Sequence, residues 1–328
     1  MEKHYISVPE YLVFENTIHF INSFKLLNEQ RLYVFDFKNL RRIDPFSILL
    51  LSSELEIFKK NNPESKFSAK NFEHCTYAAH MGFFQSFGLD FGKFPGEAKN
   101  NNRYIPLKIY TVSDIKQSAR DALVNPGEIL EDFAREISTV LTQNTDKNLA
   151  DILRYCIREI FRNIVEHSNT TKFGFCAQYL PSLNKVSFSV LDRGMGIKNS
   201  LSENPELNLN DDLTALKESL KPGISGKTYP SQLNKPTGEW ANSGFGLFMT
   251  SSICKNGGSF FIASGESGIY LSQGNEKILN VNIQGSALNL TINLDKKEKF
   301  REILANLHKE IKEFENIKAS KSSLDILE

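Results

Sequence analysis

The chain has 328 residues, of which 40% are hydrophobic and 24% are charged, as is typical of globular proteins. This length suggests two domains, each large enough to bury a core. Lysine plus arginine and aspartate plus glutamate both number 39, so the chain has no net charge to attract nucleic acid or an anionic membrane. The first residues show no signal-peptide pattern, and no uninterrupted apolar run reaches about 18 residues. We therefore expect a soluble, cytoplasmic protein that neither spans a membrane nor binds nucleic acid directly.

The four cysteines indicate neither a metal site nor a redox motif. They form no C-x-x-C pair, and none lies near a histidine at the spacing of zinc ligands. We expect reduced, mostly buried thiols at these positions, which are Cys75, Cys156, Cys176 and Cys254.

Residues 1–95 combine strand and helix patterns and are expected to form a small α/β domain. Residues 31–37 (RLYVFDF) predict a buried strand, and residues 47–60 (SILLLSSELEIFKK) predict a helix that is approached by Asp44-Pro45. The composition then becomes turn-rich, with the sequence PGEAKNNN at residues 95–102. We therefore place a linker at residues 96–125.

Residues 126–295 predict a second domain. Apolar residues at helical spacing cover residues 126–141 and 146–167. Strand patterns cover residues 172–180, 185–191, 259–263, 278–284 and 287–294, and a helix that starts with glycine is expected at residues 244–255. This order predicts an α+β fold in which helices cover one face of a sheet.

The helix expected at residues 146–167 carries polar side chains beside its apolar stripe. Glu159, Asn163 and Glu166 fall within a sector of about 60°, at about 100° per residue. An amide oxygen can bind Mg²⁺, and a carboxylate one turn away can accept a proton from an attacking hydroxyl group. The alternative is that Glu159 and Asn163 are ordinary polar residues at the edge of a core face.

Two glycine-containing turns add further candidate positions. Asp192 ends a strand pattern and is followed by Gly194 and Gly196, which places a carboxylate acceptor on a loop that can approach a flat ring. Gly244 and Gly246 open the later helix, where backbone N–H groups can face phosphate oxygens. Taken alone, each pattern is explained equally well by turn formation, packing or capping. The chain contains no Walker sequence G-x-x-x-x-G-K-[ST].

The order of these patterns is more specific than any one of them. E-x-x-x-N on a helix, D-x-G-x-G after a strand and G-x-G-L at a helix start resemble the Bergerat-fold (GHKL) ATPase superfamily. Gly285-Ser286 before the last strand resembles the fourth element of that superfamily, with serine in place of the usual threonine. The resemblance covers about residues 126–295, and it implies a two-layer α/β sandwich that binds ATP with Mg²⁺.

The resemblance implies a role for each matching residue. Asn163 would hold Mg²⁺, Glu159 would be the catalytic base, and Asp192 would bind the adenine amino group. Residues 198–243 resemble the ATP lid, in which Lys227 either reaches a phosphate or is an exposed loop lysine. Of the remaining positions, Gly194 and Gly196 would shape the adenine pocket, Ser286 would support adenine through water, and Gly244 and Gly246 would cradle the phosphates.

The histidines distinguish between branches of the superfamily. Two-component histidine kinases carry an acceptor histidine followed by an acidic residue, and none of the six histidines here precedes Asp or Glu. The sequence EIFRNIVEH at residues 159–167 is instead similar to the anti-sigma-factor serine kinases, which share its Glu, Asn and His. His167 is interpreted as a helix-end residue near the C-terminal dipole, without a catalytic role.

The N-terminal domain resembles the STAS fold, whose members are the usual partners of anti-sigma serine kinases. STAS proteins carry an acceptor serine in a D-S-S-G or D-T-S-G turn, and here Phe46 takes the acceptor position after Asp44-Pro45. Ser47 is expected to cap a helix over residues 48–60 rather than to accept a phosphoryl group. The alternative is an unrelated small α/β domain.

Residues 296–328 predict an amphipathic helix and tail that would dock on the ATP-binding domain, pair with a second copy or bind another protein. We expect a regulatory protein that uses ATP and Mg²⁺ to phosphorylate a protein serine or threonine, or that hydrolyses ATP to switch partner binding. Its protein partner would be a STAS-domain protein or a transcription regulator. The alternatives are an ATP-gated clamp that dimerises without a phosphoacceptor, and a nucleotide-dependent scaffold without turnover, which Glu159 argues against.

Overall fold

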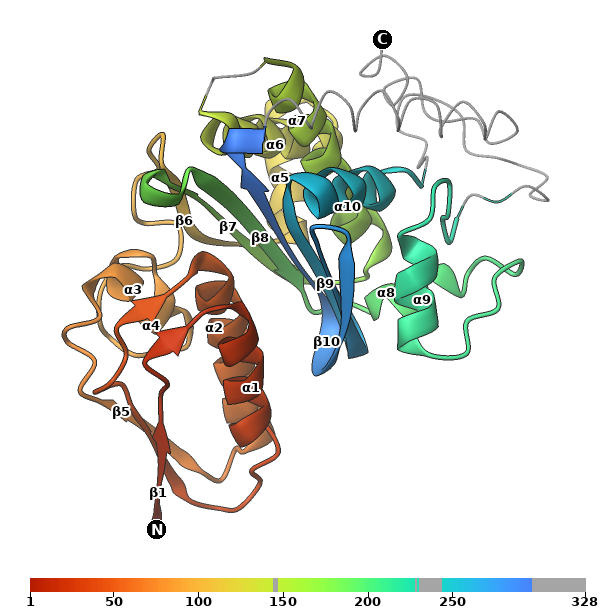
Figure 1. The fold of residues 1–328 in the computed structure, drawn as a ribbon. Coiled ribbons are helices and arrows are strands. Elements are labelled where there is room, and N and C mark those ends of the chain that lie inside the picture. The colour runs from red at the N-terminus through yellow and green to blue at the C-terminus, as the bar shows by residue number, and fades with distance from the viewer. Residues whose placement is uncertain (144–146, 228, 230–243, 297–328) are drawn as a thin grey trace. The chain divides into compact units, whose positions relative to one another are not determined.

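The computed structural model describes residues 1–143, 147–227, 229 and 244–296 (Figure 1). The described residues form two compact units, one of residues 1–109 with 174–176 and the other of the described residues within 110–173 and after 176. Helices and β-sheets are both present, so the mixed α/β character expected from the sequence is confirmed. None of the described helices is long and apolar enough to cross a membrane. The helix and tail expected at residues 296–328 lie outside the described residues, apart from Lys296.

The first unit is built on a three-stranded parallel sheet. Its elements are β1 (Lys3–Ser7), β2 (Tyr11–Leu12), α1 (Phe14–Phe24), β3 (Leu32–Asp36), β4 (Arg42–Ile43), α2 (Pro45–Asn61), β5 (Lys66–Lys70), α3 (Thr76–His80) and α4 (Phe83–Ser86). The strand order is β1-β3-β5, and Val34 lies opposite both Tyr5 and Ser68. The short strands β2 and β4 form a separate parallel pair.

The start of α2 differs from the expected one, and Asp44 is the reason. Its side chain caps the helix by accepting a hydrogen bond from the Ser47 N–H at 2.7 Å, while Pro45 occupies the first turn, where no N–H is needed. The prediction that Ser47 caps the helix was therefore wrong. Ser47 lies inside α2 and is fully buried, and its Oγ accepts a hydrogen bond from Thr17 Oγ1 at 2.6 Å. Phe46 is buried as well.

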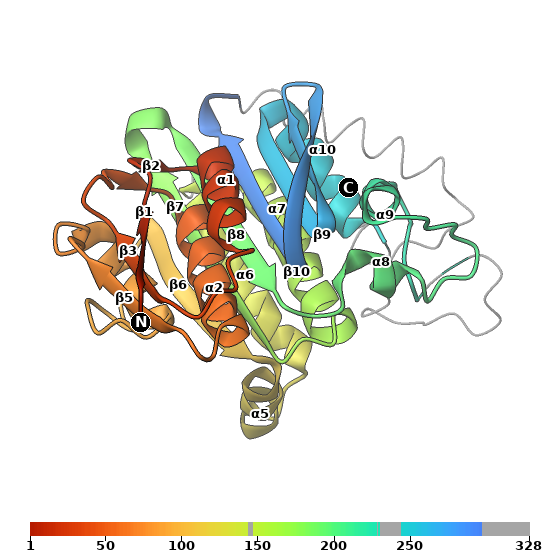
Figure 2. The same ribbon diagram turned by 90° about the horizontal axis from the view of Figure 1, so that it is seen from below.

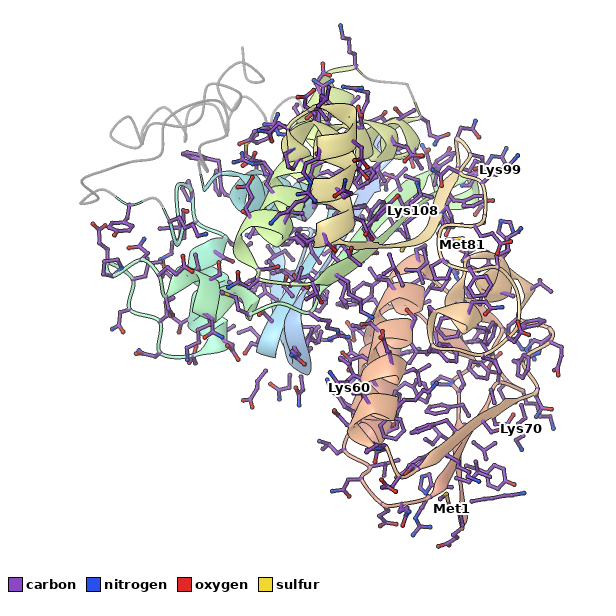
Figure 3. All side chains as sticks on the ribbon, turned by 180° about the vertical axis from the view of Figure 1, so that it is seen from behind. Met1, Lys60, Lys70, Met81, Lys99 and Lys108 are labelled. Atoms are coloured by element: carbon purple, nitrogen blue, oxygen red, sulfur yellow. The ribbon has the colours of Figure 1, made fainter. Side chains whose placement is uncertain are left out.

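Aromatic side chains fill the core of the first unit between its helices and its sheet. The ring of Phe58 lies edge-on to Phe24 and to Tyr33, with centroid distances of 5.2 and 5.0 Å. Such pairs contribute about 0.5–1.5 kcal/mol each beyond the burial of their area. At the end of β5, Lys70, which is labelled in Figure 3, lies 2.9 Å from the Asp36 carboxylate at the end of β3. The pair ties the ends of neighbouring strands together.

A five-stranded sheet organises the chain from residue 104 to residue 293. The elements of this part are β6 (Tyr104–Thr111), α5 (Val112–Ala122), α6 (Pro126–Thr142), α7 (Lys147–Arg162), a π-turn (Asn163–His167), β7 (Lys172–Leu180), a 3₁₀ turn (Pro181–Leu183), β8 (Lys185–Asp192), α8 (Gly196–Leu201), α9 (Asp212–Ser219), α10 (Gly246–Gly257), β9 (Gly258–Ser272), β10 (Asn275–Asn293) and a 3₁₀ turn (Leu294–Lys296). The strand order is β6-β7-β8-β10-β9, with β10 antiparallel to both of its neighbours. The helices α6, α7 and α10 lie along one face of these strands (Figure 2). Residues 96–125, which were expected to form a linker, contain β6 and α5.

The strand β10 is continuous where two strands were expected. Its pairing with β9 shifts register twice, the second time between Ile283 and Ser286. Gly285 lies within this second shift with φ at +85°, a conformation that glycine adopts without strain. Over this shift β10 advances by three residues and β9 by one, so two extra residues of β10 are absorbed as a bulge and the strand continues past Gly285. The bulge leaves Ser286 paired with the end of β8.

Candidate functional site

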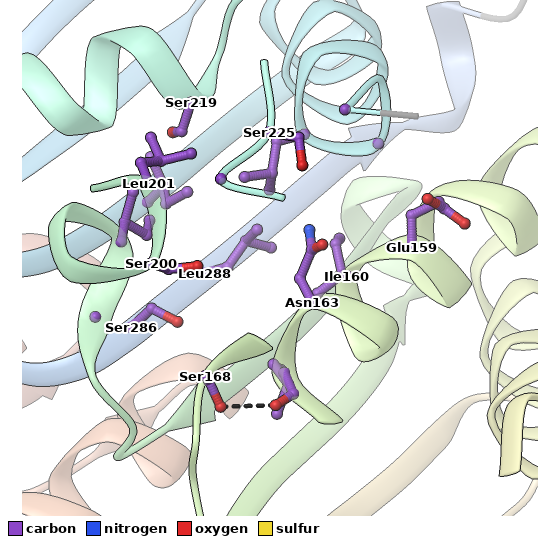
Figure 4. A pocket seen from close by; sticks show the side chains of 18 of the residues that line it. Glu159, Ile160, Asn163, Ser168, Ser200, Leu201, Ser219, Ser225, Ser286 and Leu288 are labelled. Atoms are coloured by element: carbon purple, nitrogen blue, oxygen red, sulfur yellow. Dashed lines mark hydrogen bonds between the residues drawn. The ribbon is translucent and has the colours of Figure 1, made fainter. Parts of the chain in front are cut away.

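A pocket lies within the second unit, between α7, α8, the start of α10 and the strands β8 and β10 (Figure 4). The residues expected to form the site come from stretches of the chain far apart in sequence, and all but Gly194 line this pocket. Those that line it are Glu159, Asn163, Asp192, Gly196, Lys227, Gly244, Gly246 and Ser286.

Asp192 forms the polar floor of one end of the pocket. It is the last residue of β8 and is only 1% exposed. The Gly194 N–H donates to its Oδ1 at 2.8 Å, and the Ser286 hydroxyl donates to its Oδ2. Burial raises the pKa of Asp192, while these two hydrogen bonds oppose the rise. The carboxylate is therefore held in one orientation by donors on both oxygens.

Gly194 lies behind the Asp192 end of the pocket and does not line the pocket itself. Its backbone packs against Ser168 so closely that a Cβ would lie 2.0 Å from the Ser168 carbonyl oxygen. That carbonyl accepts a hydrogen bond from the Met195 N–H at 2.7 Å, and the Ser168 hydroxyl donates to Ile164 O at 2.7 Å (Figure 4). Ser168 also lines the pocket and was not among the expected residues. It follows a π-turn, which the helical pattern of the sequence did not reveal.

Apolar side chains line the middle of the pocket. They come from α7 and the π-turn, from α8, and from three neighbouring strands of the sheet. A slot lined in this way, with a buried acceptor at its end, suits a flat, hydrogen-bonding ring. The residues are Ile160, Ile164, Val190, Ile197, Leu201, Ile262 and Leu288.

The start of α10 forms the opposite end of the pocket. Gly244 has φ at +70°, and Gly246 is the first helical residue. A Cβ on Gly246 would lie 2.6 Å from Glu159 Cβ, so the helix begins in direct contact with α7. Among the described residues, no side chain caps this N-terminus. The N–H groups of a helix start favour anionic oxygen atoms.

Glu159 lines the pocket with the stem of its side chain, but its carboxylate is held by arginines. Its Oε1 lies 3.0 Å from Arg162 Nη1 and 3.5 Å from Arg158 Nη2. Glu159 and Arg162 are 3% and 2% exposed. Figure 4 shows the carboxylate turned away from Asn163. The expected residue is therefore in the pocket wall, and its acidic group is engaged in a buried ion pair that no pattern in the sequence indicated.

Arg162 connects Glu159 to a second carboxylate. Its Nε lies 3.3 Å from Glu166 Oε1. Burial disfavours the charged guanidinium, but the charges of Glu159 and Glu166 outweigh this effect and raise the pKa of Arg162. The helix changes from α to π at Asn163, so Glu166 lies at the surface beside Arg162 rather than in the pocket.

Asn163 faces the pocket at the start of the π-turn (Figure 4). Within the described ranges, no three His, Cys, Asp or Glu side chains gather as a metal site. A Mg²⁺ ion usually takes one or two protein oxygen atoms and completes its shell with water and with the phosphates of a nucleotide. One pocket-lining amide beside a helix N-terminus fits that mode of binding, whereas it does not fit a site made by the protein alone.

Lys227 adds a positive charge to the pocket wall, with its Nζ 3.4 Å from the Glu166 carbonyl oxygen. Lys227, Asn163 and the start of α10 all line the pocket, and the segment before Lys227 reaches the entry to α10 through Ile224, whose carbonyl oxygen would lie 2.7 Å from a Cβ on Gly244. A comparison of the sequence with protein-family models and with curated proteins found no match.

Proposed function

We propose that the pocket binds ATP with Mg²⁺ in the way of the Bergerat-fold ATPases that residues 126–295 resemble. The observation that carries the proposal is the division of the pocket into a buried carboxylate, an apolar slot and an anion-binding end. Asp192 would accept a hydrogen bond from the adenine amino group, and the apolar side chains would cover the ring. The start of α10 and Lys227 would bind the phosphates.

Asn163 would hold the metal ion together with phosphate oxygens. The bound ion would neutralise the charge that develops on the phosphoryl group in transfer. Asn163 supplies a neutral oxygen ligand and so fixes the ion at one side of the pocket. The resident side chains therefore bind, orient and shield the nucleotide.

Glu159 is the proposed general base of a phosphoryl transfer to a protein serine or threonine, or to water. In the ion pair with Arg162 its carboxylate is turned away from the pocket. It would have to rotate toward the pocket to accept a proton from the attacking hydroxyl group. The ion pair thus supports slow intrinsic turnover. It favours the second candidate function, an ATP-gated clamp in which the binding of ATP, rather than its hydrolysis, drives dimerisation.

We propose that the first unit is a STAS-like module that regulates through docking. Its parallel sheet and the turn at Asp44 support this, and the buried Phe46 and Ser47 offer no hydroxyl group to a kinase. The partner would be a protein, such as a STAS-domain protein or a transcription regulator, or a second copy of the chain.

Calorimetry on the full chain tests the binding proposal. Mg·ATP should bind, and Mg·GTP should bind at least tenfold more weakly, because a 6-oxo group has no proton to donate to Asp192. Asp192→Ala should reduce the affinity for ATP and for adenosine alike. Absence of ATP binding at millimolar concentration would remove the proposal. Labelled ATP with a cell lysate then separates the reactions, since a labelled second protein indicates a kinase and free phosphate indicates an ATPase.

A further inference from the structure

Residues 223–227, here called the wall segment, line the pocket through Ile224, Ser225, Gly226 and Lys227. The segment leaves α9 and crosses from α8 to the π-turn. At one side Gly226 packs on Ser200 so closely that a Cβ would lie 2.1 Å from the Ser200 carbonyl oxygen. At the other side Lys227 Nζ contacts the Glu166 carbonyl oxygen.

The wall segment also contacts the entry to α10. A Cβ on Gly244 would lie 2.7 Å from the Ile224 carbonyl oxygen. Within the segment, the Lys227 N–H donates to Ser225 Oγ at 3.1 Å, which forms a tight turn before the lysine side chain. Figure 4 shows Ser225 and Asn163 on facing sides of the pocket. The segment is therefore already formed where the phosphates would lie.

One side chain outside the pocket holds the wall segment in place through a hydrogen bond. Asn204 follows α8 and is only 4% exposed, and its Nδ2 donates to the Ser225 carbonyl oxygen at 2.9 Å. Its Oδ1 accepts a hydrogen bond from the Glu206 N–H at 2.9 Å, which fixes the orientation of the amide. Ser225 is buried as well. Both halves of the Asn204 amide thus have partners, and only one of these belongs to the wall segment.

We propose that Asn204 is a positioning residue that holds the wall segment in place for the anionic end of the ligand. This inference rests on the proposed binding of ATP. A segment that is fixed before binding loses less conformational freedom when the ligand arrives, so the interaction is stronger than with a loose segment. Asn204 touches neither end of the ligand, and its effect is confined to the groups that the wall segment presents. Adenosine, which lacks phosphates, does not use those groups.

The test compares two ligands on one variant. In Asn204→Ala the affinity for Mg·ATP, measured by calorimetry on the full chain, should fall about tenfold, while the affinity for adenosine stays within about twofold. Ser202→Ala is the matched control, because Ser202 also follows α8 but its exposed hydroxyl donates to Lys198 O and has no described contact with the wall segment. It should change neither affinity. An unchanged affinity for ATP in Asn204→Ala, or an equal loss for both ligands, overturns the proposal.

A second variant disturbs the same segment from another side. Gly226→Ala places a methyl group against the Ser200 carbonyl oxygen and should displace the wall segment while Asn204 is retained. It should reproduce the selective loss of ATP affinity, and it serves as the test if Asn204→Ala does not fold. The two proposals fail differently. If the unaltered protein binds neither adenosine nor ATP, the binding function is wrong, whereas binding that both variants leave unchanged removes only the positioning role.

Discussion

Ser286 lies directly opposite Asp192 in the antiparallel pairing of β10 with β8, and its hydroxyl donates to the Asp192 carboxylate. The resemblance to the Bergerat-fold ATPases implied that this serine supports adenine through water. In the structure its direct partner is the buried carboxylate, so Ser286 helps to orient Asp192. The bulge at Gly285 precedes this pairing in β10.

Removing the Ser286 hydroxyl should therefore destabilise the fold as well as weaken binding. In Ser286→Ala a buried carboxylate oxygen loses its donor, which costs about 1–3 kcal/mol in the free energy of unfolding. Urea denaturation measures this cost, and calorimetry with adenosine measures the loss of affinity. Ser286→Thr keeps the hydroxyl and should retain most of the stability and most of the affinity for adenosine. A Ser286→Ala protein as stable as the unaltered one would show that the hydrogen bond has no net effect.

The raised pKa of Asp192 predicts a pH dependence of stability. Because the folded state binds this proton more tightly than the unfolded chain does, the contribution is fully present below the ordinary aspartate pKa. It is lost as the pH rises through the raised pKa of the folded state. Asp192→Asn cannot titrate, so the unaltered protein should lose stability relative to this variant as the pH rises above the ordinary aspartate pKa of about 4.

The measurement is the difference in the free energy of unfolding between the two proteins at each pH. Asp44, whose pKa is also raised by burial, is present in both and cancels from the difference. A difference that does not depend on pH would mean that the pKa of Asp192 is the same in the folded and unfolded chains.

The buried pair of Arg162 and Glu159 predicts a large effect of removing one partner. Arg162→Met leaves the Glu159 carboxylate buried without its closest counter-charge, which costs about 3–5 kcal/mol in the free energy of unfolding. The double variant Arg162→Met/Glu159→Met should recover much of this loss. Arg135→Met, which breaks the exposed pair with Asp132, is the control and should cost less than about 1 kcal/mol. Equal losses in the two arginine variants would contradict the burial argument.

Asn163→Ala should weaken the binding of Mg·ATP by about tenfold or more and leave the binding of adenosine unchanged, because the amide oxygen is the proposed ligand of the metal ion. The half-buried position at the pocket wall allows the fold to persist. Calorimetry with and without Mg²⁺ separates the two effects. A folded variant that binds Mg·ATP as tightly as before would exclude Asn163 from the metal site.

Ser47 should carry no phosphate after the protein is incubated with Mg·ATP. Its side chain is fully buried in α2 and bonded to Thr17, so the hydroxyl cannot reach an active site in a folded protein. Phosphopeptide mapping checks this. A stoichiometric phosphate on Ser47 that disappears in Glu159→Gln would make the protein a self-modifying switch and would contradict the docking function of the first unit.

The sequence indicated most of the pocket because its residues follow regular spacing. Glu159 and Asn163 lie one helical turn apart, and Asp192 ends a strand, so their placement depends on local geometry. The orientation of the Glu159 carboxylate depends on Arg162 and on a change from α to π winding, and neither has a distinct pattern of apolar residues. Asn204 was missed for a related reason, since a lone asparagine after a short helix is common in turns. Its partner Ser225 is 21 residues away.

A glycine at a helix start can be required for packing between helices or for binding of phosphate, and the contact between Gly246 and Glu159 separates these two explanations. At 2.6 Å, a Cβ at residue 246 would overlap the Cβ that every side chain other than glycine places at residue 159. Shortening Glu159 to alanine therefore makes no room, and only a second glycine would. In relatives of this chain, glycine at position 246 should persist wherever position 159 carries any side chain, including proteins that have lost phosphate binding. The second glycine of G-x-G-L is therefore explained by the close approach of α10 to α7. Its presence alone does not indicate that phosphate binds there.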